Sequence, residues 1–261
     1  MEGNVDVTSA FHWSLYLYAI EGFLFFAVVT QTKSQEPGSH GGIARSFGTL
    51  FLFQSIAAVL LAIASLSGQG TVSRYCGIGS ACSAVMVAIS CIPAATHVSV
   101  PDFRKGVLKT VCFVLYAVFV AAGGFYWSRH VATTPEIPSV SEQLRRQIAG
   151  ALGGGMVSIL ASSLIRLTRK VKGRNGASVL FLGSSLAVLA GLIWLHFEPL
   201  CNASSRLMWS DTCPLPRVYD HNALLVSFLF CANILGAEGV LRLMAVGSGD
   251  GLIEGYTEIG P

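Results

Sequence analysis

The sequence predicts an all-α, polytopic membrane protein with seven transmembrane helices, an exoplasmic N-terminus and a cytoplasmic C-terminus. Three observations lead to this prediction: the apolar composition, the number of apolar runs and the uneven distribution of Lys and Arg. Of the 261 residues, 52% are hydrophobic and 12% are charged, whereas about 25% of the residues in soluble domains are charged. The mean hydropathy is +0.62. We therefore expect a lipid bilayer to be the main solvent of this chain.

Seven runs have the length that a bilayer requires, because a spanning helix needs about 20 mostly apolar residues. The runs are Phe11–Thr30, Phe47–Leu66, Cys76–Ala95, Val107–Trp127, Ile148–Leu167, Ala177–His196 and Asn222–Met244. Acidic Glu2 and Asp6 precede the first run in place of a basic segment, so we expect a span there and not a signal peptide. The connectors are short, which predicts one membrane domain over residues 1–261.

The orientation is predicted from Lys and Arg, which are enriched in short cytoplasmic loops. With seven spans, 11 of the 17 basic residues lie on one side and 6 on the other. The richer side includes the Arg169–Arg174 segment, so we expect it to be cytoplasmic. The sequence does not distinguish an endomembrane from the plasma membrane.

Features of the opposite side agree with this orientation. The N-x-S/T sequon at Asn202 falls in the last outer loop, where glycosylation is expected. All four tryptophans lie at or beyond the predicted outer boundary, as in an interfacial aromatic belt; they are Trp13, Trp127, Trp194 and Trp209.

Three cysteines are predicted to face the oxidising side, where disulfides form. A Cys201–Cys213 bridge would close the last outer loop, and a bridge from Cys76 to either would tie that loop to the third span. The sequence leaves these alternatives open.

Glu21 is the first candidate for a functional residue, since polar groups inside a bilayer are costly. It lies about nine residues into the first span, roughly 13 Å below the outer boundary. Gln54 and Asn233 are expected at comparable depth, so the three could form a cluster. The alternative is that they only hydrogen-bond across helices. Deeper in the last span, Glu238 is expected to pair with Arg242 at i+4.

A second polar group is predicted at the outer ends of the last two spans. It comprises His196, Glu198, Tyr219, Asp220, His221 and Asn222. His196 and His221 are candidate zinc ligands, and Asp220 with His221 is a candidate acid/base pair acting on a lipid head group. The alternative is that Asp220 caps the last helix and that the others lie at a wet interface.

Several functional classes lack their motifs in this sequence. The last span contains no Lys, which excludes a retinal Schiff base, and the chain has no Walker loop, Rossmann fingerprint, HExxH or GxSxG. We expect no nucleic-acid partner.

The Tyr219-Asp220-His221-Asn222-Ala223-Leu224 segment resembles an uncharacterised family of small seven-span membrane proteins, whose last helix begins with a phrase like F-[DN]-H-N-[AD]-L. That family is distantly similar to the seven-span superfamily of alkaline ceramidases and progestin and adiponectin receptors. The resemblance implies a zinc site built from histidines of the early and last spans. This chain departs from that pattern, because Leu225 and Val226 stand where a second His of the last helix is expected. Of the implied ligands only His221 remains, with His196 as a substitute.

Two functions from different classes follow from these features. The first is an intramembrane enzyme, of hydrolase or cyclase type, that acts on a membrane lipid or isoprenoid substrate with Glu21, Asp220 and His221 as catalytic residues. A protonated Glu21 could start a cyclisation, as an embedded acid is thought to do in the small membrane-bound terpene cyclases of fungi; this comparison is an analogy of size and span count. The second is a receptor, carrier or scaffold without chemistry.

Overall fold

The computed structural model describes residues 7–35, 41–67, 71–99, 114, 118, 155–168, 173–201, 214–215 and 221–246. These residues form helices, short turns and no strand. The helices are α1 (Val7–Gln35), α2 (Gly41–Leu66), α3 (Thr71–Ser99), α6 (Val157–Thr168), α7 (Arg174–Cys201) and α8 (His221–Ala245).

Five of these helices are long and apolar enough to cross a membrane. They are α1, α2, α3, α7 and α8, whereas α6 has 12 residues. Hydroxyl groups inside the helices donate to carbonyls one turn back, as Ser55 does to Phe51 and Ser184 to Leu180. These bonds satisfy polar side chains that apolar surroundings would otherwise leave without a partner. Length, composition and hydrogen bonding therefore indicate a multi-pass integral membrane protein.

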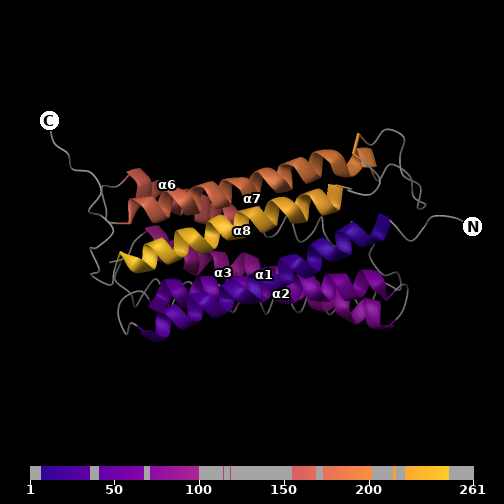
Figure 1. Cartoon of the computed structure of the whole chain (residues 1–261), viewed down its shortest axis with the longest axis horizontal. Helices are drawn as coiled ribbons and strands as arrows, with labels where there is room; N and C mark the ends of the chain where they lie inside the picture. Colours follow the sequence, from indigo (N-terminus) through magenta and orange to yellow (C-terminus); the bar gives the residue numbers. More distant parts are fainter. Residues whose placement is uncertain are drawn as a thin grey trace, which may run out of the picture.

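The described helices form a ring, as the contacts between them show. α1 packs on α2, α2 on α3, α3 on α6, α6 on α7, α7 on α8, and α8 returns to α1. Figure 1 shows the long helices running side by side along the long axis of the molecule, with α7 and α8 above α1 and α2. Side chains from the inner faces of the helices meet inside this ring.

The two ends of the bundle can be identified by side-chain contacts between helix termini. At the His12 end, His12 of α1 contacts Ser65 near the end of α2, and Trp194 of α7 contacts Asn222 at the start of α8. At the Arg166 end, Arg166 of α6 contacts Val98 near the end of α3. α1 and α2 therefore run in opposite directions, as do α7 and α8.

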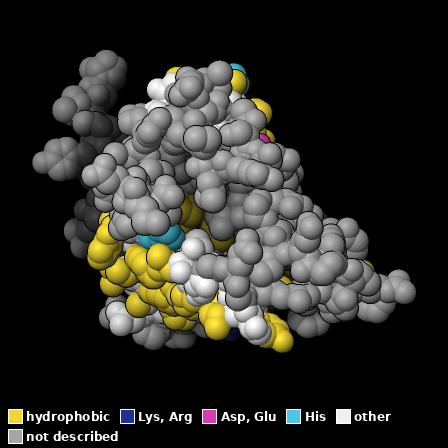
Figure 2. Space-filling view, turned by 90° about the vertical axis from the view of Figure 1, so that its right-hand side faces the viewer, with side chains coloured by type: hydrophobic (Ala, Val, Ile, Leu, Met, Phe, Trp, Pro, Cys, Tyr) yellow, Lys and Arg dark blue, Asp and Glu magenta, His cyan; other side chains and the backbone are white. Residues whose placement is uncertain are grey.

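Lys and Arg are distributed unequally between these ends among the residues that the structure describes. Lys33, Arg45, Arg166, Arg174 and Arg242 occupy helix positions toward the Arg166 end, whereas Arg74 lies at the start of α3 toward the His12 end. Figure 2 looks onto the His12 end, where hydrophobic side chains of described residues lie beside histidine side chains.

Part of the predicted topology falls outside the described residues. The predicted span Val107–Trp127 is described only at positions 114 and 118, and the predicted span Ile148–Leu167 only from position 155. The number of seven spans and the sidedness of the termini therefore stay predictions.

Candidate functional site

The candidate site is a layer of polar residues between two hydrophobic clusters. One cluster, at the His12 end, includes Leu15, Trp194 and Leu225. The other, toward the Arg166 end, includes Phe51 and Val240. Both clusters draw on α1, α2 and α8, and each of these helices carries a buried polar residue at the level where one cluster gives way to the other. These residues are Glu21, Gln54 and Asn233, each 6% exposed.

Glu21 and Asn233 face each other between α1 and α8. The amide of Asn233 is close enough to interact with the carboxyl of Glu21 and with the phenol of Tyr18. Tyr18 precedes Glu21 by three residues, which places both side chains on one face of α1. The structure thus brings two of the three predicted midplane residues together and adds Tyr18, which is 8% exposed.

A close approach of α1 and α2 places Gln54 at the same level. A Cβ on Gly22 would collide with the Ser55 hydroxyl and would lie 3.1 Å from the Phe51 carbonyl oxygen. Only glycine lets the two backbones come this near, which is the role that small residues have in membrane helix packing. Since Glu21 and Gln54 are the neighbours of Gly22 and Ser55 in sequence, they lie at matching depth.

Most hydrogen-bonding groups of Glu21, Gln54 and Asn233 that are buried in this layer make no hydrogen bond of standard geometry within the described part of the chain. Both carboxyl oxygens of Glu21, Oε1 of Gln54 and Nδ2 of Asn233 are buried without a hydrogen-bond partner of standard geometry. An unsatisfied buried polar group costs about 1–3 kcal/mol. A set of such groups in one layer is therefore typical of a site that binds something, and such groups in a native fold call for an explanation.

An apolar pocket adjoins the layer, and Asn233 forms part of its wall. The pocket is half open and small, with a cavity volume of about 30 Å³, which is room for about one water molecule. Its lining comes from α2, α6, α7 and α8 and from the residue that precedes α6: Phe47, Leu50, Phe51, Met156, Ile159, Leu180, Gly183, Ser184, Ala187, Leu229, Ala232, Asn233 and Gly236. Glu21 is not among the described residues that line the pocket. The pocket is therefore a small, mainly apolar recess with Asn233 as a polar group in its wall.

The two histidines predicted as zinc ligands have different environments. His221 is 3% exposed, and its ring centroid lies 5.9 Å from that of Trp194. His196 is exposed, and its ring packs against Phe197. No group of three or more His, Cys, Asp and Glu that could hold a metal ion occurs in the part of the chain that the structure describes. Asp220 lies outside the described residues, so its predicted pairing with His221 remains a prediction.

Trp194 corrects one feature of the predicted aromatic belt. Its side chain is 1% exposed and donates from Nε1 to Oδ1 of Asn222 at 2.8 Å. The indole therefore joins α7 to α8 instead of facing lipid. Trp13, in contrast, is 69% exposed, as an interfacial residue would be.

The predicted outer loop falls mostly outside the described residues. Cys201 is disulfide-bonded, whereas Cys76 is a free thiol. The alternative bridge through Cys76 is therefore not formed. Cys213 and the predicted glycosylation site Asn202 lie outside the described residues, so both predictions stay open.

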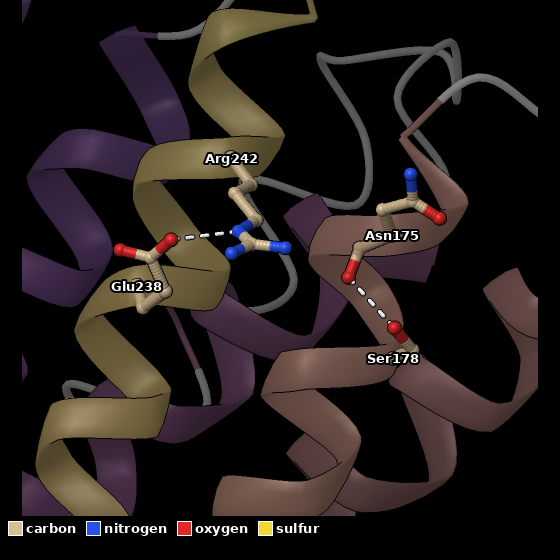
Figure 3. Close-up of polar contacts among 4 residues, drawn as sticks. All are labelled: Asn175, Ser178, Glu238 and Arg242. Atoms are coloured by element: carbon tan, nitrogen blue, oxygen red, sulfur yellow. Dashed lines mark hydrogen bonds and ion pairs between the residues drawn. The ribbon is translucent and has the colours of Figure 1, made fainter. Parts of the chain in front are cut away.

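The predicted Glu238–Arg242 pair is confirmed. Figure 3 shows the carboxyl of Glu238 and the guanidinium of Arg242 one turn apart on α8, with Asn175 and Ser178 on neighbouring α7. The distance between Oε1 of Glu238 and Nε of Arg242 is 2.7 Å. Both side chains of the pair are about half exposed. This carboxylate is therefore a surface group that offers a control for Glu21.

Sequence reasoning missed three buried polar residues. Tyr18 could have been found from its i, i+3 spacing to Glu21. His12, whose Nε2 lies 2.7 Å from Ser65 Oγ, had no signal, because its partner lies in another helix. Arg166 is 6% exposed and donates from Nη1 to the Val98 carbonyl at 2.9 Å; its place at the end of an apolar run suggested only a loop charge.

No family model matches this chain, and no curated protein and no solved structure matches it either.

Proposed function

We propose that this chain is a seven-span intramembrane enzyme that acts on a lipid or isoprenoid substrate, with Glu21 as proton donor or substrate anchor. One observation carries the proposal: the carboxyl of Glu21, buried without a hydrogen bond of standard geometry, lies beside Asn233, and Asn233 lines an apolar pocket. A central acidic residue opposes membrane insertion by about 2.5–3.5 kcal/mol. Among the residues that the structure describes, Glu21 has no cationic partner, so its presence at this depth needs a compensating role.

The environment of Glu21 supports acid chemistry. A carboxyl buried among apolar helices is neutral, because an isolated charge in such surroundings is far more costly than a proton. A neutral carboxyl has an O–H to donate, and Tyr18 supplies a second titratable group on the same face. General acid catalysis requires such a donor within hydrogen-bond reach of the reacting group of the substrate.

The lining of the pocket is mainly apolar and includes aromatic rings. Phe51 lies in its wall and packs against Phe25 with 5.5 Å between ring centroids. Aromatic faces stabilise positive charge, so a cation formed on an isoprenoid skeleton after protonation would have a suitable neighbour. This supports the cyclase type over the zinc hydrolase, for which the described residues do not assemble a ligand set.

We further propose that the His12 end is exoplasmic and the Arg166 end cytoplasmic. The excess of Lys and Arg toward the Arg166 end supports this orientation. In this topology Asp220 and His221 would lie near the exoplasmic head groups, where they could act on the polar part of a lipid. The choice between endomembrane and plasma membrane does not affect the proposal.

The second candidate is a carrier or receptor that binds the same ligand without changing it. The buried polar layer of Glu21, Gln54 and Asn233 favours it, because these groups could hold a ligand by hydrogen bonds without transferring a proton. The two functions differ in whether the titratable proton of Glu21 is needed.

The proposed enzyme can be tested on cell membranes that contain the wild type, Glu21→Gln or Glu238→Gln at matched abundance. Lipid extracts are compared by mass spectrometry. We expect the wild type and Glu238→Gln to deplete and produce the same lipid species, and Glu21→Gln to leave them unchanged. Identical lipid profiles for the wild type and Glu21→Gln would refute the enzyme and leave the carrier or receptor.

A further inference from the structure

Glu21 of α1 and Gln54 of α2 belong to helix faces that meet each other. Phe25 follows Glu21 by four residues and Phe51 precedes Gln54 by three, so each ring shares a face with the polar residue of its helix. The two rings are in contact, with 5.5 Å between their centroids. Since α1 and α2 run in opposite directions, Glu21 and Gln54 both lie one turn from this contact, toward the His12 end.

Asn233 of α8 adjoins both of these faces. Its side chain is close enough to interact with the carboxyl of Glu21, and it lines the same small pocket as Phe51. Three helices therefore supply one buried polar side chain each to a common layer, and each of the three side chains is 6% exposed. The cavity volume of the adjoining pocket, about 30 Å³, suits a ligand of the size of a water molecule or an ion.

The layer presents oxygen atoms that have not been used in hydrogen bonds of standard geometry. These atoms are both carboxyl oxygens of Glu21 and Oε1 of Gln54, and Nδ2 of Asn233 lies among them as a donor. A 180° turn of the Asn233 amide would present Oδ1 in place of Nδ2 without changing the shape of the side chain. Carboxylate and amide oxygens are the ligands that hard cations prefer.

The charge of the layer selects a monovalent cation. Glu21 can carry one negative charge, whereas the amides of Gln54 and Asn233 are neutral. Because a net charge buried among apolar helices is costly, a carboxylate at this position needs one positive charge to balance it. Na⁺ would make the site neutral, but Ca²⁺ or Mg²⁺ would leave an excess positive charge. The amide and carboxylate oxygens thus favour Na⁺, in contrast to the histidine-based zinc site that the sequence suggested.

We propose that Glu21, Gln54 and Asn233 bind one Na⁺ ion in exchange for the carboxyl proton of Glu21. Binding converts the neutral carboxyl into a carboxylate paired with Na⁺ and releases one proton to water, so the charge is conserved. The site depends only on the three side chains. Its consequence rests on the proposed function, because a Glu21 that holds Na⁺ has no proton to donate. Na⁺ would therefore inhibit the acid chemistry.

The test uses the full chain in phosphatidylcholine nanodiscs. Thermal unfolding is measured in NaCl, choline chloride and CaCl₂ at equal ionic strength, which keeps the screening of surface charges the same. A ligand that binds only the folded state stabilises it, so we expect the unfolding midpoint to rise with Na⁺ concentration and not with choline. We also expect the infrared spectrum to contain the C=O stretch of a protonated carboxyl in choline chloride and to lose it in NaCl.

Two variants assign the effect to this layer. Glu21→Gln should abolish both the Na⁺ dependence of the midpoint and the infrared change. Gln54→Leu removes a neutral oxygen and should raise the Na⁺ concentration for the half-maximal effect about tenfold, which corresponds to about 1.4 kcal/mol. Glu238→Gln is the matched control, because this carboxylate belongs to an exposed ion pair, and it should respond to Na⁺ like the wild type. If Glu21→Gln does not fold, the infrared comparison of the wild type with Gln54→Leu replaces it.

Equal midpoints of the wild type in NaCl and choline chloride would overturn the inference. A Na⁺ response that Glu21→Gln retains would also overturn it, as would a stronger Glu21-dependent response to Ca²⁺ than to Na⁺. The proposed function fails separately. If Na⁺ binds while Glu21→Gln leaves the lipid profile of membranes unchanged from the wild type, the ion site stands and the enzyme does not. If Na⁺ has no effect while Glu21→Gln alters the profile, the enzyme stands and the ion site is wrong.

Discussion

His12 on α1 and Ser65 on the last turn of α2 form a hydrogen bond of 2.7 Å between Nε2 and Oγ. His12 is 7% exposed, so the bond links the two helices in buried surroundings at the His12 end. A double-mutant cycle of His12→Ala and Ser65→Ala should give a coupling free energy of about 0.6–1.7 kcal/mol, the range of interhelical hydrogen bonds in membrane proteins.

The coupling can be measured by reversible unfolding in detergent micelles. Ser67→Ala is the control, because the exposed Ser67 hydroxyl, one residue past the end of α2, donates to the Ile63 carbonyl of that helix. We expect no coupling between Ser67→Ala and His12→Ala. A coupling near zero for Ser65 and His12 would mean that the contact does not hold α1 to α2.

Gly239 and Gly236 lie one turn apart on α8 and should respond differently to the same substitution. A Cβ on Gly239 would lie 2.7 Å from the Leu180 backbone nitrogen and 3.0 Å from the Gly176 carbonyl oxygen, so Gly239→Ala should lower the free energy of unfolding by about 1–3 kcal/mol. Gly236→Ala meets no atom and should change it by less than about 0.5 kcal/mol. Equal effects of the two substitutions would contradict the described α7–α8 contact.

Arg166 joins the end of α6 to the end of α3 through the Val98 carbonyl, 2.9 Å from Nη1. Arg166→Leu removes a buried, charge-assisted hydrogen bond and should cost about 1.5–3 kcal/mol of stability. Arg242→Leu removes only the exposed pair with Glu238 and should cost about 0.3–0.5 kcal/mol. Thermal unfolding of both variants at matched detergent concentration provides the comparison, and a smaller loss for Arg166→Leu than for Arg242→Leu would argue against this bond.

The predicted topology can be tested with single cysteines in a background without other cysteines. A cysteine near Ser205, beside the predicted glycosylation site Asn202, should react with a membrane-impermeant maleimide on intact cells if these residues are exoplasmic. A cysteine in the basic segment 169–174 should react only after permeabilisation. The opposite pattern would reverse the orientation.

The sequence was sufficient for the fold class because apolar runs of about 20 residues allow little besides a membrane helix. Depth along a span was also predictable, since the rise of a helix is fixed at 1.5 Å per residue; this placed Glu21, Gln54 and Asn233 at one level. Rotation of each helix about its axis was not predictable. Neither were pairs such as His12 with Ser65, because these depend on packing between helices that the sequence does not state.

The surroundings of the pocket were likewise not predictable from the sequence. Asn233 was recognised as a buried amide, but only the structure places it between Glu21 and an apolar space lined from four helices. The contrast between Gly236 and Gly239 had no sequence signal at all, because a glycine at a helix contact and a glycine at a cavity read alike. The environment of Trp194 was misjudged for a related reason, since a position near a helix end does not say whether the indole faces lipid or protein.

The central claim is that the proton of Glu21 performs chemistry. The most direct measurement compares turnover of a membrane lipid extract by purified wild type, Glu21→Gln and Glu21→Leu in vesicles, with the amount of folded protein determined for each. Glu21→Gln keeps the size of the side chain and can accept and donate hydrogen bonds, but it has no titratable proton. We expect Glu21→Gln to fold to the same extent as the wild type and to lose at least about 100-fold in turnover, the lower range for removing a general acid. Full turnover by Glu21→Gln, together with loss of folded protein in Glu21→Leu, would show that Glu21 only supports packing and would contradict the account.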